Sequence, residues 1–520
     1  MIGLRSYAPG ELDRLKDSYL ADPSRCNENS LYDQTWHDMN MDQVLARIDT
    51  CSSLAGEERL YALLREPFSD EAEIKRRDAL IRYFDTNRDI AGEYKKRLAE
   101  IGDNIRQPAS VTIAKLSEVD PENNAFHIVC ALLGLFSLAM IFVSPTAGLL
   151  VFLAVLALNI STYFKRKGEI GEYLACFTYL IRSYRAVRSM LTVPDNEDMA
   201  YRNDLRRAAA SLKGVVRGSF LVTGGRGLTG NIMNMVLDYL RLFFHLDLIK
   251  FNTMTKRVLQ HREDIELMSE SLGEIDAFIA VAAYRRSLPY WCVPEYVSDI
   301  SLDIKGVSHP LLESPVSADI CAEGKGVLVT GSNASGKSTF LRSVALASIL
   351  GQSIATAYAG SFRTSRFHII SSMAVADDIV SGSSYYMAEI KALKHVIDSS
   401  TDSRPVICFV DEVLKGTNTV ERIAASSEIL KSLYRDNVIC FAATHDIELT
   451  EILSSYYDNY HFEEDIKDDE VLFSYKLMRG SATTRNAIRL LKVMGYGDSI
   501  TESAELRAEE FERNGNWPKA

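Results

Sequence analysis

The stretch Gly331-Ser-Asn-Ala-Ser-Gly336-Lys337-Ser338 follows the pattern G-x-x-x-x-G-K-[ST]. It lies between an apolar run at residues 326–330, which predicts a strand, and residues 339–350, which predict a helix. In such a turn the backbone N–H groups and the positive end of the helix face an anion. Lys337 would reach the β- and γ-phosphates of a nucleoside triphosphate, and Ser338 would ligate Mg²⁺. The stretch therefore predicts a nucleotide-binding α/β domain, and an incidental glycine turn is the alternative.

Two further apolar runs end in residues suited to nucleotide hydrolysis. Residues 406–410 lead into Asp411 and Glu412, and residues 438–444 lead into His445. We expect the first run to form a strand beside the phosphate-binding turn, so that Asp411 holds Mg²⁺ and Glu412 orients or deprotonates water. At the carboxyl end of the next strand, His445 is placed to sense the γ-phosphate. The alternatives are a helix N-cap for the acidic pair and a structural role for the histidine.

The chain changes its pattern near residue 302. The first 290 residues are mostly helical by their periodicity, for example at 57–65, 71–84, 201–212 and 232–248. Beyond residue 302, strand-like and helix-like segments alternate, which is typical of an α/β domain. The acidic run at 463–470 is predicted to be a solvated loop between two strands. We therefore expect an all-α arm followed by an α/β domain.

Residues 123–164 contain no Asp, Glu, Lys or Arg. One membrane-spanning helix needs about 20 apolar residues, so this stretch is long enough for two. Pro145 divides it into residues 126–143 and 147–163, which predicts a transmembrane helical hairpin. Basic residues follow at 165–167, and the positive-inside rule places this flank, and with it both soluble parts, on the cytoplasmic side of the cytoplasmic membrane. A buried hairpin in a soluble domain and one long tilted span are the alternatives.

Composition limits the remaining possibilities. A chain of 520 residues exceeds a single core, so two or three domains are expected. The net charge of -12 argues against a broad nucleic-acid-coating surface, although a local basic channel fits within that total. The eight cysteines form no CxxC pair, which favours reduced thiols over zinc sites or a disulfide framework.

Taken together, four segments resemble the ordered ATPase motifs of MutS-type DNA mismatch repair proteins. These segments are residues 330–339, 377–389, 411–419 and 443–445. The resemblance extends to His309-Pro310 at the entry to the ATPase domain, to residues 475–481 before the terminal helices, and more weakly to residues 50–77 at the start of the family's helical core and lever. It covers roughly residues 260 to 500 well and 35 to 125 weakly. Ser335 departs from the family's Gly-Gly-Lys. We also expect the chain to lack the family's mismatch-reading domain with its Phe-x-Glu wedge.

The resemblance implies an ATPase that hydrolyses ATP to ADP and phosphate with Mg²⁺ and works as a homodimer with composite sites. The residues that would bind the nucleotide are Gly331, Asn333, Gly336, Lys337, Ser338 and Thr339. Ser338 and Asp411 would hold the metal, and Glu412 and His445 would be catalytic. Ser384 would complete the partner subunit's site in trans, and residues 416–418 would cross the dimer interface.

We expect four parts: the first part of a helical core and lever at 1–122, a transmembrane hairpin at 123–164, the second part of the core and lever at 165–295, and a P-loop ATPase domain of the ABC and MutS type at 296–520. Two functions remain open. One is a membrane-tethered MutS-like ATPase that acts on double-stranded DNA. The other is a membrane-bound nucleotide switch that acts on an unknown protein partner without DNA. Salt-dependent binding to duplex DNA would separate them, because phosphate contacts give a steep salt dependence.

Overall fold

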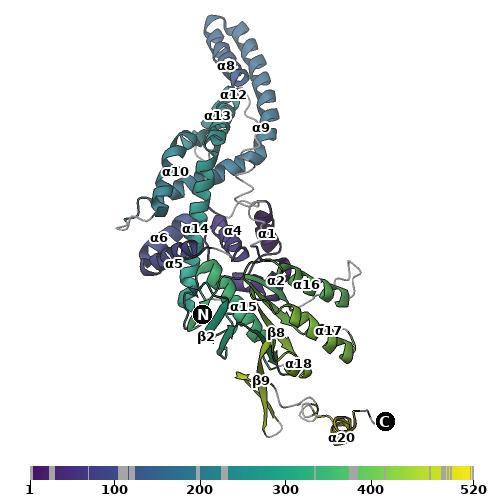
Figure 1. Cartoon of the computed structure of the whole chain (residues 1–520). Coiled ribbons are helices and arrows are strands. Elements are labelled where there is room, and N and C mark those ends of the chain that lie inside the picture. Colours follow the sequence, from purple (N-terminus) through teal and green to yellow (C-terminus); the bar gives the residue numbers. More distant parts are fainter. Residues whose placement is uncertain are drawn as a thin grey trace.

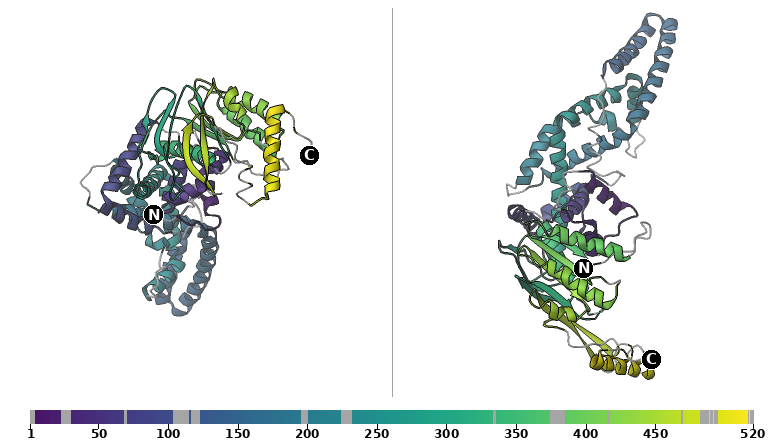
Figure 2. Two further views of the ribbon diagram at one scale, coloured as in Figure 1. Left: turned by 90° about the horizontal axis from the view of Figure 1, so that it is seen from below. Right: turned by 45° about the vertical axis from the view of Figure 1, so that its right-hand side comes forward.

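The computed structural model shows an elongated molecule (Figure 1). It describes residues 4–22, 30–67, 70–102, 115, 123–194, 200–223, 232–332, 335–373, 385–414, 417–467, 470–481, 488, 491, 495–515 and 517. A helical hairpin forms one end, the α/β domain fills the other half, and the C-terminal helix α20 (Asp498–Asn514) lies at the opposite end from the hairpin. The right panel of Figure 2, turned by 45° about the vertical axis, shows the same order.

The N-terminal half is helical, as the periodicity predicts. Its helices before the hairpin are α1 (Glu11–Leu20), α2 (Asp33–Asp38), α3 (Met41–Ile48), α4 (Leu54–Arg65), α5 (Glu71–Thr86) and α6 (Arg88–Ala99). After the hairpin come α10 (Ala200–Val216), α11 (Phe220–Thr223), α12 (Ile232–Phe244), α13 (Leu246–Gln260) and α14 (Arg262–Ser287). The predicted helix at 232–248 is interrupted at His245, whose φ of 52° is left-handed and separates α12 from α13.

Helix α14 joins the two parts of the helical half. The buried Asp276 in its middle accepts hydrogen bonds from the backbone N–H groups of Ser52 and Ser53, at 2.9 and 2.7 Å, and from the Ser53 hydroxyl at 2.6 Å. Ser53 in turn caps the N-terminus of α4 by accepting from Gly56 N–H. One buried carboxylate therefore connects segments on either side of the hairpin.

Helices α8 (Ala125–Val143) and α9 (Pro145–Met190) form the hairpin, with the break at Ser144. The two helices approach closely at Gly148, where a Cβ atom would lie 2.5 Å from the backbone nitrogen of Ile141. Both are long and apolar enough to cross a membrane, with mean hydropathies of 2.5 over Ala125–Val143 and 2.0 over Pro145–Gly171. Helix α9 continues beyond residue 164 to Met190, so the hairpin and the arm share one helix.

A six-stranded sheet organises the α/β domain. Its strand order is β10-β9-β4-β8-β7-β6, and only the β10–β9 pair is antiparallel. The strands are β4 (Gly326–Thr330), β6 (His368–Ser372), β7 (Val406–Asp411), β8 (Val438–Thr444), β9 (Tyr457–Lys467) and β10 (Glu470–Arg479). Beside it lies a smaller sheet, in the order β1-β5-β2-β3, made of β1 (Glu295–Tyr296), β2 (Ser301–Val307), β3 (Ala318–Glu323) and β5 (Ser361–Thr364).

Helices cover both faces of the large sheet because its strands alternate apolar side chains between the faces. On one face Val327 and Phe409 pack in the same core as α15 (Lys337–Ile354). On the other face Leu328 and Cys408 pack with α16 (Tyr385–Ser399), α17 (Thr419–Ser432) and α18 (Glu448–Ile452). The expected α/β arrangement after residue 302 is therefore present.

One expectation about this domain is wrong. The acidic run at 463–470 was expected to be a loop, but β9 extends to Lys467 and β10 begins at Glu470. Charged residues are common on edge strands such as β10.

The helical half is held to the α/β domain by buried charged groups. Arg285 of α14 donates to the Ala355 carbonyl at 2.7 Å, pairs with Asp78 at 2.8 Å and lies over the ring of Trp291. Asp38 at the end of α2 accepts from the hydroxyl of Ser371 at 2.6 Å. These contacts hold the helical half against the C-terminal end of α15 and against β6.

Candidate active site

Both glycines of the turn between β4 and α15 have a positive φ angle. Gly331 follows β4 directly with a φ of 142°, and Gly336 is the N-cap of α15 with a left-handed φ of 105°. A Cβ atom on Gly336 would also lie 3.2 Å from Cδ1 of Tyr475. Ser335, the departure from the family pattern, is buried and donates from its hydroxyl to the Ser332 carbonyl at 2.8 Å. The serine thus helps to close the turn.

Lys337, the first residue of α15, lies beneath this turn. Its ammonium donates to the carbonyls of Gly331 and Ser332, at 2.6 and 2.7 Å. It also lies 3.5 Å from Nδ1 of His445. The structure therefore brings the predicted lysine and the predicted histidine, which are far apart in sequence, into one site.

Glu412 completes this group. Its carboxylate contacts Nε2 of His445, so Lys337, His445 and Glu412 form a continuous chain of polar contacts. Glu412 has a left-handed φ of 57°, and its N–H donates to the Ala443 carbonyl at 2.9 Å. A non-glycine residue in this conformation is strained, and strain of this kind occurs preferentially at functional sites.

One detail of the predicted arrangement is wrong. Strand β7, which ends in Asp411, was expected beside the turn, but β8 lies between β4 and β7. Because β8 is the direct neighbour of β4, His445 at its end lies closer to the turn in the sheet order than Asp411 does. Parallel pairing still brings the carboxyl ends of all three strands to the same edge.

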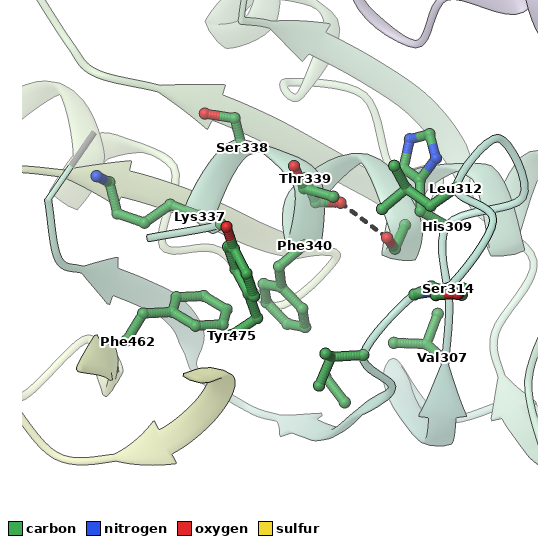
Figure 3. Close-up of a pocket in the computed structure, with 15 residues that line it drawn as sticks. Val307, His309, Leu312, Ser314, Lys337, Ser338, Thr339, Phe340, Phe462 and Tyr475 are labelled. Atoms are coloured by element: carbon green, nitrogen blue, oxygen red, sulfur yellow. Dashed lines mark hydrogen bonds between the residues drawn. The ribbon is translucent and has the colours of Figure 1, made fainter. Parts of the chain in front are cut away.

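A cavity of about 450 Å³ opens beside the first turn of α15. Ser338 and Thr339 line it together with Gly336 and Lys337. Figure 3 shows the rings of Phe340, Phe462 and Tyr475 close together below the helix, and Ser338 and Thr339 above them. The cavity therefore combines apolar rings with the polar start of a helix, as a nucleotide site requires.

The far wall of this cavity contains His309, which the sequence suggested only as the entry to the domain. Burial lowers the pKa of His309 to about 4, and the charge of Arg342 contributes to the same shift. The imidazole is therefore neutral at pH 7 and adds no positive charge to the cavity.

Sequence reasoning missed two residues that support the site. Arg422 of α17 forms two hydrogen bonds to the carboxylate of Asp446, at 2.6 and 2.9 Å. Asp446 directly follows His445, so this bidentate pair anchors the segment that carries the histidine. Tyr475 was predicted only as part of the segment at 475–481. In the structure it lies at an irregularity in β10, has a left-handed φ of 52° and packs against the turn.

Three of the predicted residues cannot be placed. Asn333, Ser384 and Gly416 lie outside the described residues, so their roles stay predictions.

The donor set fits a magnesium ion that is held mainly by a nucleotide. Within the described part of the chain, no group of three or more His, Cys, Asp or Glu side chains is arranged to hold a metal ion alone. Mg²⁺ usually keeps several waters and binds one or two carboxylates together with substrate phosphates. Ser338, at the cavity, and Asp411, at the end of β7, would supply the protein ligands under this scheme.

Comparisons with known proteins find similarity in the α/β domain. Residues 327–512 match the model of MutS domain V. The chain is 29% identical over 279 residues to the DNA mismatch repair protein MutS of Rickettsia bellii (strain RML369-C), covering 51% of this chain and 31% of that protein. It is 27% identical over 294 residues to the protein of that name from Lactobacillus delbrueckii subsp. bulgaricus, covering 54% and 34%.

A mouse relative gives a similar result. The chain is 30% identical over 286 residues to MutS protein homolog 4 of Mus musculus, covering 52% of this chain and 28% of that protein. The match thus spans about a third of the length of these curated relatives. Together, these matches show that about half of this chain is similar to MutS proteins.

Proposed function

We propose that this chain is a MutS-like ATPase that converts ATP and water to ADP and phosphate. The observation that carries the proposal is the chain of contacts from Lys337 through His445 to Glu412, at the edge where three parallel strands end. The similarity to MutS domain V over residues 327–512 supports the same chemistry.

Each residue of the site has a distinct task. Lys337 would exchange its bonds to the turn carbonyls for phosphate oxygens, and the N–H groups at the start of α15 would bind the same phosphates. Glu412 would orient the attacking water and accept its proton, while His445 would hold Glu412 in place and contact the γ-phosphate. Mg²⁺, held by Ser338 and Asp411, would offset the negative charge of the phosphates.

The cavity beside α15 would take the nucleoside. The rings of Phe340, Phe462 and Tyr475 offer apolar surfaces for a base. His309 is neutral, so this wall of the cavity suits the uncharged nucleoside.

The ATPase proposal is tested with the full chain purified in detergent. Lys337→Ala removes the main positive charge over the phosphates, so ATP binding and hydrolysis should both be lost. Lys431→Ala, on the exposed side of α17, is the matched control and should behave like the parental chain. Hydrolysis by the Lys337→Ala variant at the parental rate would refute the proposed role of this lysine.

We further propose that the active unit is a homodimer in which Ser384 acts in trans. Lys337→Ala and Ser384→Ala should each be nearly inactive alone, because every site in such a dimer carries a lesion. A purified mixed dimer should regain activity, because one of its two sites then combines an intact turn with an intact Ser384. Absence of this rescue would place Ser384 outside the partner's site.

We also propose that the hairpin tethers the ATPase to the cytoplasmic membrane, with both soluble parts in the cytoplasm. The outer surface of the hairpin is apolar and exposed, for example at Phe142, which is 90% exposed, and at Leu150, which is 71% exposed. Contact between such a surface and water is unfavourable, and burial in a lipid bilayer would remove this cost.

Two proposals differ in the macromolecule on which this tethered ATPase acts: double-stranded DNA or a protein partner. Similarity to DNA mismatch repair proteins favours double-stranded DNA. The continuous helix α9, which runs from the hairpin into the arm, favours a nucleotide switch that moves the arm against a protein partner at the membrane. Titration of labelled homoduplex and mismatched DNA at several salt concentrations, with and without ATP, decides between them. Binding that weakens steeply with salt supports DNA, and no binding at low salt supports the switch.

A further inference from the structure

Helix α12 is attached to the middle of the hairpin, far from the tip. The Phe243 carbonyl accepts a hydrogen bond from the Asn159 side chain at 2.8 Å. The centre of the Phe243 ring lies 5.4 Å from the centre of the Phe152 ring. On the other hairpin helix, a Cβ atom on Gly134 would lie 3.0 Å from the Phe243 ring. Figure 1 shows α12 beside the hairpin.

These contacts fix the depth of α12 in any membrane that the hairpin crosses. At 1.5 Å per residue, Asn159 lies roughly 8 Å from the charged end of the apolar stretch at Phe164, and Gly134 lies roughly 14 Å from the start of α8. The C-terminal end of α12 therefore lies within the same layer as the hairpin helices. With 13 residues, α12 is too short to cross this layer by itself.

The outward side of α12 is apolar. Met235, Val236, Tyr239 and Leu240 are between 39 and 67% exposed, and their spacing places them on one face of the helix. The buried Arg241 lies on another side, where it pairs with Asp238 at 2.7 Å and donates to the Phe220 carbonyl at 2.7 Å. An apolar face of this size, joined to the apolar hairpin, is the pattern of a helix that lies in a membrane interface.

Basic side chains gather at the level where the hairpin leaves the apolar layer. The side chain of Asn124, at the start of α8, donates to the Ile249 carbonyl at 3.3 Å, which places Lys250 at this level. Lys250 packs against Gly218, next to Arg217, and Arg257 donates to the Gly214 carbonyl.

No carboxylate of the described residues forms an ion pair with Arg217, Lys250 or Arg257. Burial lowers the pKa of Lys250, and the charges of Arg257 and Arg217 lower it further. The three cations are thus close enough to repel one another, which a nearby anion would relieve.

We infer that α12 is an interfacial membrane helix whose face of Met235, Val236, Tyr239 and Leu240 contacts acyl chains, while Arg217, Lys250 and Arg257 contact the phosphate groups of acidic phospholipids. This inference rests on the proposed insertion of the hairpin. It adds a third membrane element and a lipid preference to the two helices that are long enough to span.

Tryptophan quenching by brominated phospholipids tests the inference in proteoliposomes of the full chain. Tyr239→Trp should be quenched above the background of the native tryptophans in the parental chain. Leu150→Trp, on the hairpin, reports hairpin insertion independently, and Tyr434→Trp, on the exposed surface of the α/β domain, should show no additional quenching. Quenching of Leu150→Trp without quenching of Tyr239→Trp overturns the inference and leaves the hairpin intact. Absence of both signals refutes the membrane hairpin itself.

The lipid preference has its own test in the Tyr239→Trp background. Brominated phosphatidylglycerol should quench this tryptophan more strongly than brominated phosphatidylcholine. Arg217→Gln with Lys250→Gln should remove this preference, since each basic residue near a membrane contributes about fivefold to the attraction for anionic lipid. The control is Arg513→Gln, on the distant helix α20. Equal quenching by both lipids in the parental background would refute the role of the cations.

Discussion

The proposed nucleotide site and the hairpin were both predicted from the sequence, but they are encoded in different ways. The site depends on a few residues at fixed spacing, and the folded chain encloses them with contacts from strands β4, β7, β8, β9 and β10 and helices α15 and α17. The hairpin depends on composition alone, and much of its outer surface touches nothing in the chain. A motif with fixed spacing therefore predicts which residues meet in the folded protein. An apolar composition instead predicts whether lipid or water surrounds a segment.

The largest expected effect tests whether lipid or water surrounds the hairpin. The parental chain should stay in the membrane fraction after extraction with high salt and carbonate. Leu135→Arg with Leu153→Arg places charges on exposed positions of the two helices. Insertion should become less favourable by about 10³-fold or more, because each arginine near the helix centre costs about 2.5–3.5 kcal/mol. The measurement is the fraction of protein in the carbonate-resistant pellet.

The control for this experiment is Leu506→Arg, a similarly exposed leucine on α20, which should stay with the membrane. Complete release of the parental chain by salt or carbonate would show that water, and not lipid, surrounds the hairpin.

A smaller effect is expected inside the nucleotide site. Arg422→Ala removes the bidentate bonds to Asp446 and loosens the segment that carries His445. We expect kcat for ATP to fall about tenfold with a smaller change in KM, because His445 holds the catalytic Glu412, whereas Lys337 and the start of α15 supply most of the phosphate contacts.

Arg422→Lys should restore only part of this activity, since lysine keeps the charge but not the bidentate geometry. If KM rose while kcat stayed constant, Arg422 would support the nucleotide pocket instead of His445. The unfolding midpoint of each variant serves as the check on general destabilisation.

The smallest effect concerns the wall of the cavity. Burial holds the pKa of His309 near 4, below its ordinary value, so this group is neutral throughout the range from pH 6 to pH 8. Nucleotide affinity should therefore have the same pH profile in the parental chain and in His309→Gln over this range. Profiles that diverge near pH 6 would show that His309 takes up a proton there.

The lowered pKa of His309 also predicts how the stability of the fold changes with pH. The folded chain binds fewer protons at His309 than the unfolded chain does below about pH 6.5, so this residue destabilises the fold as the pH falls toward 4. His309→Gln should remove that contribution, which comparison of urea unfolding at pH 5 and pH 7 would reveal.

Local patterns predicted the local parts of the fold. The apolar run at 326–330 became β4, and the helix after Gly336 begins where the glycine pattern places it. The end of the apolar stretch near residue 164 was well marked by charge, but it did not mark the end of a helix. Lysine, arginine and glutamate are good helix formers, so α9 continues into the arm.

Long-range features were beyond the sequence. No spacing rule places β8 between β4 and β7, because strand order depends on how crossovers pack in three dimensions. The pair of Arg422 and Asp446 joins a helix to the end of a strand, and the bend at Tyr475 arises within an irregular strand pair. Each of these was missed because it depends on tertiary packing and has no periodic signal.

The central claim, that Glu412 is the base of an ATP-hydrolysing site, is tested most directly by Glu412→Gln in the full chain. This variant keeps the size of the side chain and its place beside His445, so ATP should still bind, while single-turnover hydrolysis should fall by about 10² or more. Glu451→Gln, an exposed residue of α18, is the matched control and should hydrolyse ATP normally. The account predicts that Glu412→Gln is recovered with bound ATP, and hydrolysis at the parental rate would contradict it.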